Sequence, residues 1–240
     1  MTPETRTKAA LHAQSESPRE ACGLVIVRHG REIYHPCKNL STNGNQFIMA
    51  PDDYALAEGR GEVIAVVHSH PYASPEPSEA DRAACEQSGL PWHIVSVPGF
   101  EWVTIEPSGW RAPLIGREFH HGVLDCYTLI QDWYAENMGV TLPTPYRADG
   151  WWNVGENLYL DNFAAAGFER VMVSDDKRPN EFKVGDILLM QICSPVPNHG
   201  AIWNGDGTIS HHLANMLSSR DVYGGYFRKH TTHVLRYTHT

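Results

Sequence analysis

The sequence has no apolar run long enough to cross a membrane. A membrane-spanning helix needs about 18 or more consecutive apolar residues, and the 240-residue chain contains no such run. Its first twenty residues also lack the apolar core of a secretory signal peptide. We therefore expect no membrane insertion, and we expect the protein to be made and to act first in a cytoplasm.

Cysteine is scarce and does not occur in close pairs. The five cysteines are an odd number without a Cys-x-x-Cys motif, so the sequence does not predict a disulfide framework. A reducing compartment fits this usage better than an oxidising one. The cysteines are Cys22, Cys37, Cys85, Cys126 and Cys193.

Basic residues are fewer than acidic residues in both halves of the chain. The formal net charge is −9, with 8 basic and 13 acidic residues in positions 1–105 and 11 basic and 15 acidic residues in the remainder. Binding to a nucleic-acid backbone needs clustered Lys and Arg, so nucleic acid is not expected as a partner. Hydrophobic residues make up 42% of the chain, and its length suffices for two small domains with separate cores.

The first hundred residues alternate between helical and strand-like patterns. This alternation predicts an α/β domain, in which helices pack on a mixed sheet. The pattern "RHG" marks a turn between the first two strands, and Gly89 ends the third helix. Helices are expected at 3–14, 51–60 and 79–89, and strands at 21–27, 32–37, 61–70, 92–97 and 100–106.

A linker is expected within residues 107–122, which contain two prolines and three glycines and show no periodicity. We place the domain boundary between residues 108 and 109, giving domains 1–108 and 109–240. The second domain has an α+β pattern, in which "NGDG" is a strong hairpin signal. Helical segments are expected at 126–139 and 155–167, and strands at 186–192, 199–204 and 207–213.

Two histidines end the buried strand "EVIAVVHSH". Residues two apart in a strand share a face, so His68 and His70 form a suitable first pair of ligands for Zn²⁺. Pro71 stops the strand, and the following loop can bring Asp81 back as a third ligand. Three protein ligands leave a fourth position for water, as in catalytic zinc sites. Alternatively, "SEAD" is only a capping box and "HSH" a pair of surface histidines.

The spacing His-x-His, seven residues, Ser, two residues, Asp resembles the motif of the JAMM (Mov34/MPN-type) metalloproteases. Residues 68–81 match that motif at every fixed position. The resemblance covers about residues 8–105 and implies a JAMM-like domain that hydrolyses a peptide or isopeptide bond. It implies that His68, His70 and Asp81 bind Zn²⁺, that Glu20 in "SPREACGLVIV" is the general base, and that Ser78 donates a hydrogen bond to the oxyanion.

Cys126 is at the expected start of a helix, where free backbone N–H groups and the helix dipole favour a thiolate. A cysteine nucleophile also needs a histidine from elsewhere in the fold. His199 opens a strand, and the returning strand of the hairpin has His211 and His212. A hairpin centred near Gly205 would place one of these two histidines directly opposite His199, where it can orient the His199 ring. Alternatively, Cys126 is a buried thiol and His199 an ordinary strand-end histidine.

The strings "DCYTLI", "FKVGDILLM" and "HGAIW" resemble the NlpC/P60 peptidases, which have a papain-like α+β fold. The resemblance implies Cys126 as nucleophile, His199 as base and His211 as the residue that orients it. It also implies peptidoglycan stem peptides as the substrate. The chain departs from the family at "DCYT", where Asp-Cys-Ser-Gly is usual, and at Phe119, near the position of a common tyrosine.

A JAMM domain followed by an NlpC/P60 domain resembles a family of tail assembly proteins of tailed phages. That resemblance implies a protein made in the host cytoplasm during tail assembly, with the virion tail tip as a further location and other tail tip proteins as partners. A different reading is a non-catalytic assembly chaperone or structural tip component with relic sites. A third is a deconjugating enzyme directed at host proteins, which depends on the JAMM half alone.

Overall fold

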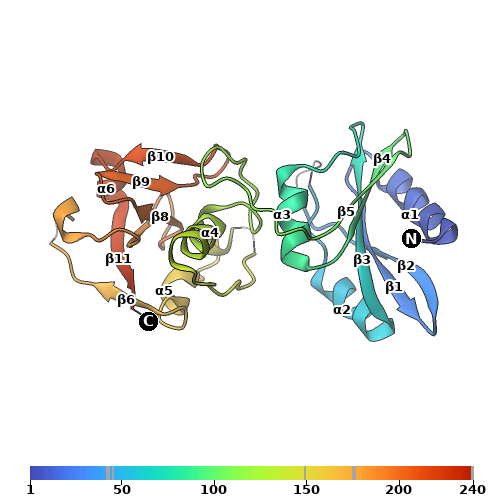
Figure 1. The fold of residues 1–240 in the computed structure, drawn as a ribbon, viewed down its shortest axis with the longest axis horizontal. Helices are drawn as coiled ribbons and strands as arrows, with labels where there is room; N and C mark the ends of the chain where they lie inside the picture. Colours follow the sequence, from blue (N-terminus) through green and yellow to red (C-terminus); the bar gives the residue numbers. More distant parts are fainter. Residues whose placement is uncertain (42–43, 45, 149, 175–176, 239–240) are drawn as a thin grey trace. The chain divides into compact units, whose positions relative to one another are not determined.

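The computed structural model describes residues 1–41, 44, 46–148, 150–174 and 177–238. The chain divides into two compact units, residues 1–110 and 111–240. Each unit has its own sheet (Figure 1) and its own buried apolar clusters. The boundary between residues 108 and 109 stays a prediction.

The first unit is a five-stranded mixed sheet with three helices, as predicted. The sheet order is β2-β1-β3-β4-β5. β3 and β4 are parallel and are joined through α3, whereas the other neighbouring pairs are antiparallel. In chain order the elements are α1 (Pro3–Glu16), β1 (Cys22–Arg28), β2 (Arg31–Cys37), α2 (Pro51–Arg60), β3 (Glu62–Pro71), α3 (Glu79–Ser88), β4 (Trp92–Val97) and β5 (Trp102–Ile105).

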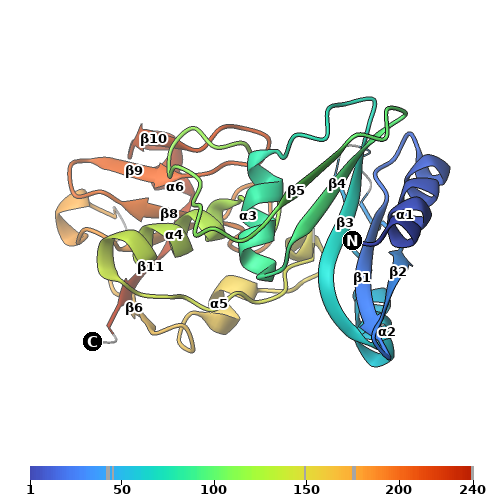
Figure 2. The same ribbon diagram turned by 45° about the vertical axis from the view of Figure 1, so that its right-hand side comes forward.

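Helices cover both faces of this sheet. Ala9 of α1 packs against Val25 on one face, whereas α2 and α3 bury Ala57 and Cys85 against Val66 on the other. Figures 1 and 2 show α1 on one side of the sheet and α2 and α3 on the opposite side. Because alternate residues of a strand share a face, the side chains that follow Val66 at two-residue steps point toward α3.

The second unit is a six-stranded antiparallel sheet of order β10-β9-β8-β7-β11-β6. The predicted first helix and the hairpin at "NGDG" are confirmed. The predicted helical stretch 155–167 contains only a five-residue α-helix, and β6, β10, α6 and β11 were not predicted. The elements are α4 (Cys126–Met138), α5 (Leu158–Asn162), β6 (Phe168–Val171), β7 (Ile187–Met190), β8 (His199–Trp203), β9 (Thr208–His211), β10 (Ser219–Val222), α6 (Gly225–His230) and β11 (Thr231–Tyr237), with short 3-10 helices at Trp151–Asn153 and Pro179–Glu181.

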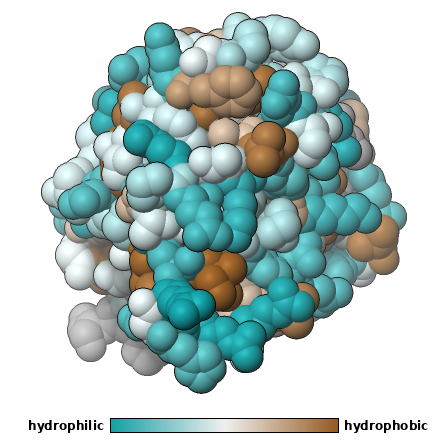
Figure 3. Space-filling model, turned by 90° about the vertical axis from the view of Figure 1, so that its right-hand side faces the viewer, coloured by the Kyte–Doolittle hydropathy of each residue, from teal (hydrophilic) through white to brown (hydrophobic). Residues whose placement is uncertain are grey.

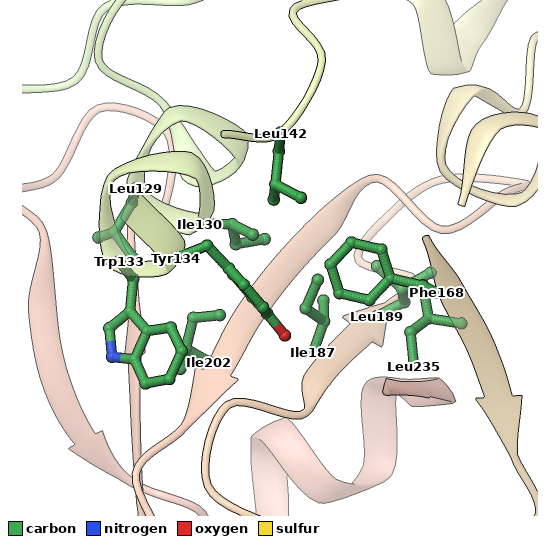
Figure 4. Close-up of a cluster of buried hydrophobic side chains, with 10 residues drawn as sticks. All are labelled: Leu129, Ile130, Trp133, Tyr134, Leu142, Phe168, Ile187, Leu189, Ile202 and Leu235. Atoms are coloured by element: carbon green, nitrogen blue, oxygen red, sulfur yellow. The ribbon is translucent and has the colours of Figure 1, made fainter. Parts of the chain in front are cut away.

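α4 is attached to the second sheet by an apolar face. Leu129, Ile130 and Trp133 pack with residues of β7 and β8, including Ile187 and Ile202 (Figure 4). Its ends have clear local signals, since Asp125 caps the N-terminus and Gly139 ends the helix in the left-handed conformation with φ of 67°. These contacts fix the first residue of α4, Cys126, relative to the start of β8.

The face of the first unit that is turned to the right in Figure 1 is mainly hydrophilic, with small apolar patches (Figure 3). Within the described residues, no helix combines the length and the apolar character needed to span a membrane.

Two candidate active sites

The predicted metal ligands of the first unit converge at the end of β3. His68 and His70 project from the face of β3 that α3 covers, and Asp81 lies in the first turn of α3. The His68 Nε2 atom is 3.0 Å from His70 Nε2 and 3.1 Å from Asp81 Oδ1, and His70 Nε2 is 3.4 Å from Asp81 Oδ2. Ligand atoms of a tetrahedral zinc are about 3.3 Å apart at bond lengths of about 2.0–2.1 Å. The three side chains therefore fit one zinc ion.

The surroundings of the two histidines act in opposite directions: burial lowers the pKa of His68, whereas at His70 the contacts with Asp81 and Ser74 outweigh burial and raise the pKa. His70 Nδ1 donates to the Ser74 carbonyl oxygen at 2.8 Å, which leaves the lone pair on Nε2, facing the other ligands. The His68 ring is buried and lies close to the rings of Phe47 and Trp92, with centroid distances of 5.1 and 5.4 Å. Burial lowers the pKa of His68. On both rings Nε2 is the nitrogen that faces the other ligands and would bind a metal.

Ser78 and Asp81 form a capping box at the start of α3. The Ser78 hydroxyl oxygen accepts from the Asp81 backbone N–H at 3.1 Å, and Asp81 Oδ2 accepts from the Ser78 backbone N–H at 2.8 Å and from the Ser78 hydroxyl at 2.7 Å. "SEAD" is thus a capping box, as the alternative interpretation expected, and the capping box and the metal-site geometry occur in the same structure. Since the Ser78 hydroxyl proton is directed at Asp81, donation to an oxyanion requires the hydroxyl to turn away.

Glu20 is placed beside this cluster by the pairing of β1 with β3. Cys22 is opposite His68, and the Ser69 backbone N–H donates to the Ala21 carbonyl oxygen at 3.1 Å. Continuation of this antiparallel register places Glu20 opposite His70. The Glu20 side chain is largely buried, and this burial, reinforced by the negative charge of Asp81, raises its pKa to about 8. Of the five residues predicted for the first site, Glu20, His68 and His70 therefore lie on one face of the sheet, and Asp81 faces them from α3 together with its cap Ser78.

Cys126, in the second unit, is the first residue of α4. Asp125 accepts from the Tyr127 and Thr128 backbone N–H groups, each at 2.9 Å, and forms an ion pair with Arg147 at 2.9 Å. The expected thiolate is not favoured here, because Asp125 occupies these N–H groups. Burial raises the pKa of the Cys126 thiol, and the charge of Asp125 adds to the rise. The resting side chain is therefore a thiol.

Tyr159 is a neighbour of Cys126 that the sequence did not reveal. Its hydroxyl oxygen is 3.2 Å from Cys126 Sγ. Tyr159 comes from α5, 33 residues further along the chain, and no spacing rule connects it to the nucleophile motif. Burial raises its pKa well above the ordinary value, so the hydroxyl keeps its proton.

His199 begins β8 and lines the same cavity as Cys126. That cavity has a volume of about 210 Å³ and is also lined by Tyr159 and Trp152. The glycine after His199 permits the close approach of β8 to α4, because a Cβ at Gly200 would lie 2.8 Å from the Ile130 Cδ1 atom. Burial, followed by the charges of the neighbouring histidines, lowers the pKa of His199 to about 3. The His199 ring is therefore neutral at pH 7.

His211 is the hairpin histidine that lies next to His199. His199 Nε2 is 3.2 Å from His211 Nδ1, whereas His212 Nε2 pairs with the Met216 carbonyl oxygen at 3.1 Å. The two rings are diagonal neighbours, because His211 lies opposite Ala201 in the β8–β9 register. The predicted direct opposition is thus wrong, since the turn sets a different register. Diagonal neighbours remain within reach of each other when the side chains are large.

Asp221 extends this chain of side chains beyond the predicted residues. Its Oδ2 atom is 2.8 Å from His211 Nε2, and the Ser219 hydroxyl donates to the same oxygen at 2.8 Å. Asp221 lies on β10, which pairs with β9. It was not identified because β10 itself was not predicted from the sequence.

Two family models match the chain in the order in which the two sites occur. The model of the prokaryotic homologs of the JAB domain matches residues 2–110, and the model of the NlpC/P60 family matches residues 116–236. The protein is therefore a JAB-type domain followed by an NlpC/P60 domain. The predicted fold class, a JAMM-like mixed sheet with helices and an α+β NlpC/P60 domain, is confirmed.

Relatives that match most of this chain identify its family more narrowly. Tail tip assembly protein K of Escherichia phage N15 is 42% identical over 229 residues, which cover 94% of this chain and 91% of the relative. Tail tip assembly protein K of Escherichia phage lambda is 42% identical over 189 residues, which cover 79% and 89%. This chain belongs to the tail tip assembly protein K family.

Solved structures include more distant matches to the first unit. A JAB1/MPN domain protein from Archaeoglobus fulgidus is 22% identical, with coverage of 45% of this chain and 90% of that chain and a TM-score of 0.30.

Proposed function

We propose that this protein takes part in phage tail tip assembly and has two peptide-hydrolase sites. The first unit would be a zinc-dependent peptidase or isopeptidase, and the second a cysteine endopeptidase for peptidoglycan stem peptides. The observation that supports this proposal is that each of the two predicted sets of side chains comes together in space. His68, His70 and Asp81 come together in one unit, and Cys126 and His199 line one cavity in the other.

In the first site, His68, His70 and Asp81 would hold the metal through Nε2, Nε2 and a carboxylate oxygen. Zinc bound there would act as a Lewis acid on the scissile carbonyl and lower the pKa of water. The positive charge of a bound metal would favour the carboxylate form of Glu20, which lies beside His70. This carboxylate would accept a proton from the attacking water and deliver it to the leaving amine. Ser78 would turn its hydroxyl away from Asp81 and donate a hydrogen bond to the developing oxyanion.

In the second site, the Cys126 thiol would transfer its proton to the free nitrogen of His199. The sulfur then attacks the scissile carbonyl carbon, the C–N bond breaks, and the leaving amine takes the proton from His199. Water, deprotonated by the same ring, hydrolyses the thioester and regenerates the thiol. The Cys126 backbone N–H, at the helix start, would stabilise the oxyanion.

The biological setting of the proposal comes from the relatives, which are named as tail tip assembly proteins. Other tail tip proteins would be the binding partners, and assembly would take place in the host cytoplasm. The protein substrate of the zinc site would belong to that setting. The NlpC/P60 match supports stem peptides as the substrate of the second site.

Two observations favour a second candidate, a non-catalytic assembly component. The Ser78 hydroxyl is engaged in a helix cap, and the resting Cys126 is a thiol beside a carboxylate. Both are also properties of a resting enzyme. A relic would be expected to have lost some site residues, whereas all the residues named for the two sites are present in this chain.

Digestion of Gram-negative peptidoglycan tests the proposal. The purified full-length protein should release stem-peptide fragments, detected by mass spectrometry. Cys126→Ser should abolish the release, because the hydroxyl is a far weaker nucleophile. Cys193→Ser is the matched control, since Cys193 is exposed and should be dispensable. Equal release by wild type and Cys126→Ser, or none by wild type, would leave the assembly component as the better conclusion.

A further inference from the structure

The His211 ring has a polar partner at each nitrogen. Nε2 is 2.8 Å from an oxygen of Asp221, and Nδ1 is 3.2 Å from Nε2 of His199. Phe227 packs edge-on against the ring at a centroid distance of 4.7 Å, and the His211 side chain is 1% exposed. The ring is therefore held in an orientation that directs both nitrogens at these partners.

The contact with Asp221 determines which nitrogen of His211 carries the proton. A carboxylate can only accept, and the hydrogen bonds from His211 and Ser219 lower the pKa of Asp221 and keep it ionised. His211 must then be the donor through Nε2–H. In the neutral form of His211 this is the single N–H of the ring, and Nδ1 then has a lone pair.

The position of the proton on His199 follows from that on His211. Its Nε2 faces the lone pair of His211 and must therefore carry the N–H of that neutral ring. The remaining nitrogen of His199, Nδ1, then has the lone pair. Cys126 lines the same cavity as His199, so this lone pair is available in the cavity that contains the thiol.

We propose that Asp221 is a positioning residue that sets, through His211, the tautomer in which His199 can accept the proton of Cys126. When the thiol ionises, its proton moves to His199 Nδ1, which leaves a thiolate and an imidazolium that still donates through Nε2–H to His211. This inference deepens the proposed peptidase function of the second site and depends on it for its catalytic meaning.

Without Asp221 the opposite arrangement becomes equally available. His211 could then donate through Nδ1–H to Nε2 of His199, and the single proton of His199 would be on Nδ1. The bond between the rings is kept in either arrangement, so the two histidines alone cannot choose between them. Only one arrangement leaves a base for the thiol, and the carboxylate selects it.

The variants Asp221→Ala and Asp221→Asn test the assignment in the full-length protein. Asp221→Ala removes the acceptor, whereas Asp221→Asn keeps a carbonyl oxygen that can accept from His211. Asp206→Ala is the matched control, because Asp206 is an exposed carboxylate near the same hairpin whose partners are Thr208 and Arg220. Two readouts are measured, the ¹⁵N chemical shifts of the His199 ring and the rate of Cys126 alkylation by iodoacetamide, mapped by mass spectrometry.

Wild type and Asp206→Ala should show His199 protonated on Nε2. Asp221→Ala should give a mixture of tautomers and about tenfold slower alkylation of Cys126, as expected on loss of one charge-assisted hydrogen bond. Asp221→Asn should recover most of the rate, which a merely structural loss of β10 would not allow. An unchanged His199 tautomer in Asp221→Ala would overturn the inference. A shifted tautomer in a protein that does not cleave stem peptides would support the inference and overturn the proposed function.

Discussion

At the residue scale, each site depends on a carboxylate that its neighbours keep ionised. Burial alone would raise the pKa of Asp81, but its contacts with His68 and His70 hold that pKa far below its ordinary value. Asp125 is likewise buried, and the charge of Arg147 lowers its pKa. Removal of one partner from a buried ion pair destabilises a protein by about 3–5 kcal/mol. Arg147 therefore stabilises the start of α4, which Asp125 caps, and it also lines the cavity.

Metal content tests the roles in the first site. Wild type should bind one zinc per chain, and His68→Ala or Asp81→Ala should lose it, because each removes one of three convergent ligands. Glu20→Gln should retain zinc, since Glu20 is assigned to the water. His93→Ala is the matched control, because His93 hydrogen bonds to Thr104 outside the cluster. Metal analysis after dialysis measures the content, and loss of zinc in Glu20→Gln would contradict the role given to Glu20.

The residues predicted from sequence are those with fixed local spacing. His68, His70 and Asp81 lie within fourteen positions, where strand alternation and a helix start determine their directions. Asp221 and Tyr159 could not be predicted in this way. Both residues contact their partners only through the tertiary fold. No local sequence pattern predicts that Tyr159, in a five-residue helix, lies next to the Cys126 thiol.

At the element scale, both sites are built where a helix begins against a strand. α3 begins with Ser78 as its cap at the end of β3, and α4 begins with Asp125 as its cap against β8. Strong caps and apolar faces made these helices predictable. β10 was missed because its four residues alternate between intermediate and exposed, as on a sheet edge, and so lack an apolar signal. The predicted β8–β9 register was wrong because the register depends on the turn geometry, which the sequence does not fully determine.

Gly200→Ala tests the contact between α4 and β8. The new Cβ would be 2.8 Å from Ile130 Cδ1 and 3.2 Å from the Tyr159 hydroxyl oxygen. Such overpacking costs about 1–3 kcal/mol, which should lower the unfolding midpoint of the second unit by about 3–8 °C. Calorimetry of the full chain measures it.

Two further variants make this test specific. Gly224→Ala should leave the midpoint nearly unchanged, because its Cβ would have nothing closer than 3.9 Å. Ile130→Val removes the Cδ1 atom, so adding it to Gly200→Ala should recover part of the loss. No difference between Gly200→Ala and Gly224→Ala would show that β8 does not need its close approach to α4.

At the scale of the whole molecule, the two chemistries share no residue. The proposed zinc ligands and Glu20 belong to residues 1–110. The residues proposed for the second site, Cys126, His199, His211 and Asp221, belong to residues 111–240, and each unit has its own apolar clusters. A zinc site needs no thiol, and a Cys–His pair needs no metal. Each site should therefore be inactivated without the other.

Selective inactivation is the expected outcome. Brief treatment with iodoacetamide should abolish stem-peptide cleavage and leave zinc bound, whereas a chelator should remove zinc and leave the rate of Cys126 alkylation unchanged. Cys193→Ser is the suitable background, because Cys193 is exposed and would otherwise consume the reagent. Burial raises the pKa of Cys37 to about 12 and that of Cys85 to about 11, and it also raises the pKa of Cys22. These three thiols should therefore react slowly.

The comparison with His199→Ala determines whether the reactivity of Cys126 comes from its base. The pKa of the Cys126 thiol is raised in the resting site, so rapid alkylation near neutral pH requires His199 to take the proton. In the Cys193→Ser background, Cys126 should react faster than the three buried cysteines, and His199→Ala should remove that difference. If chelation slows alkylation of Cys126, the two units are coupled. If His199→Ala leaves the rate unchanged, the cysteine peptidase assignment fails and a structural role in tail tip assembly becomes the better conclusion.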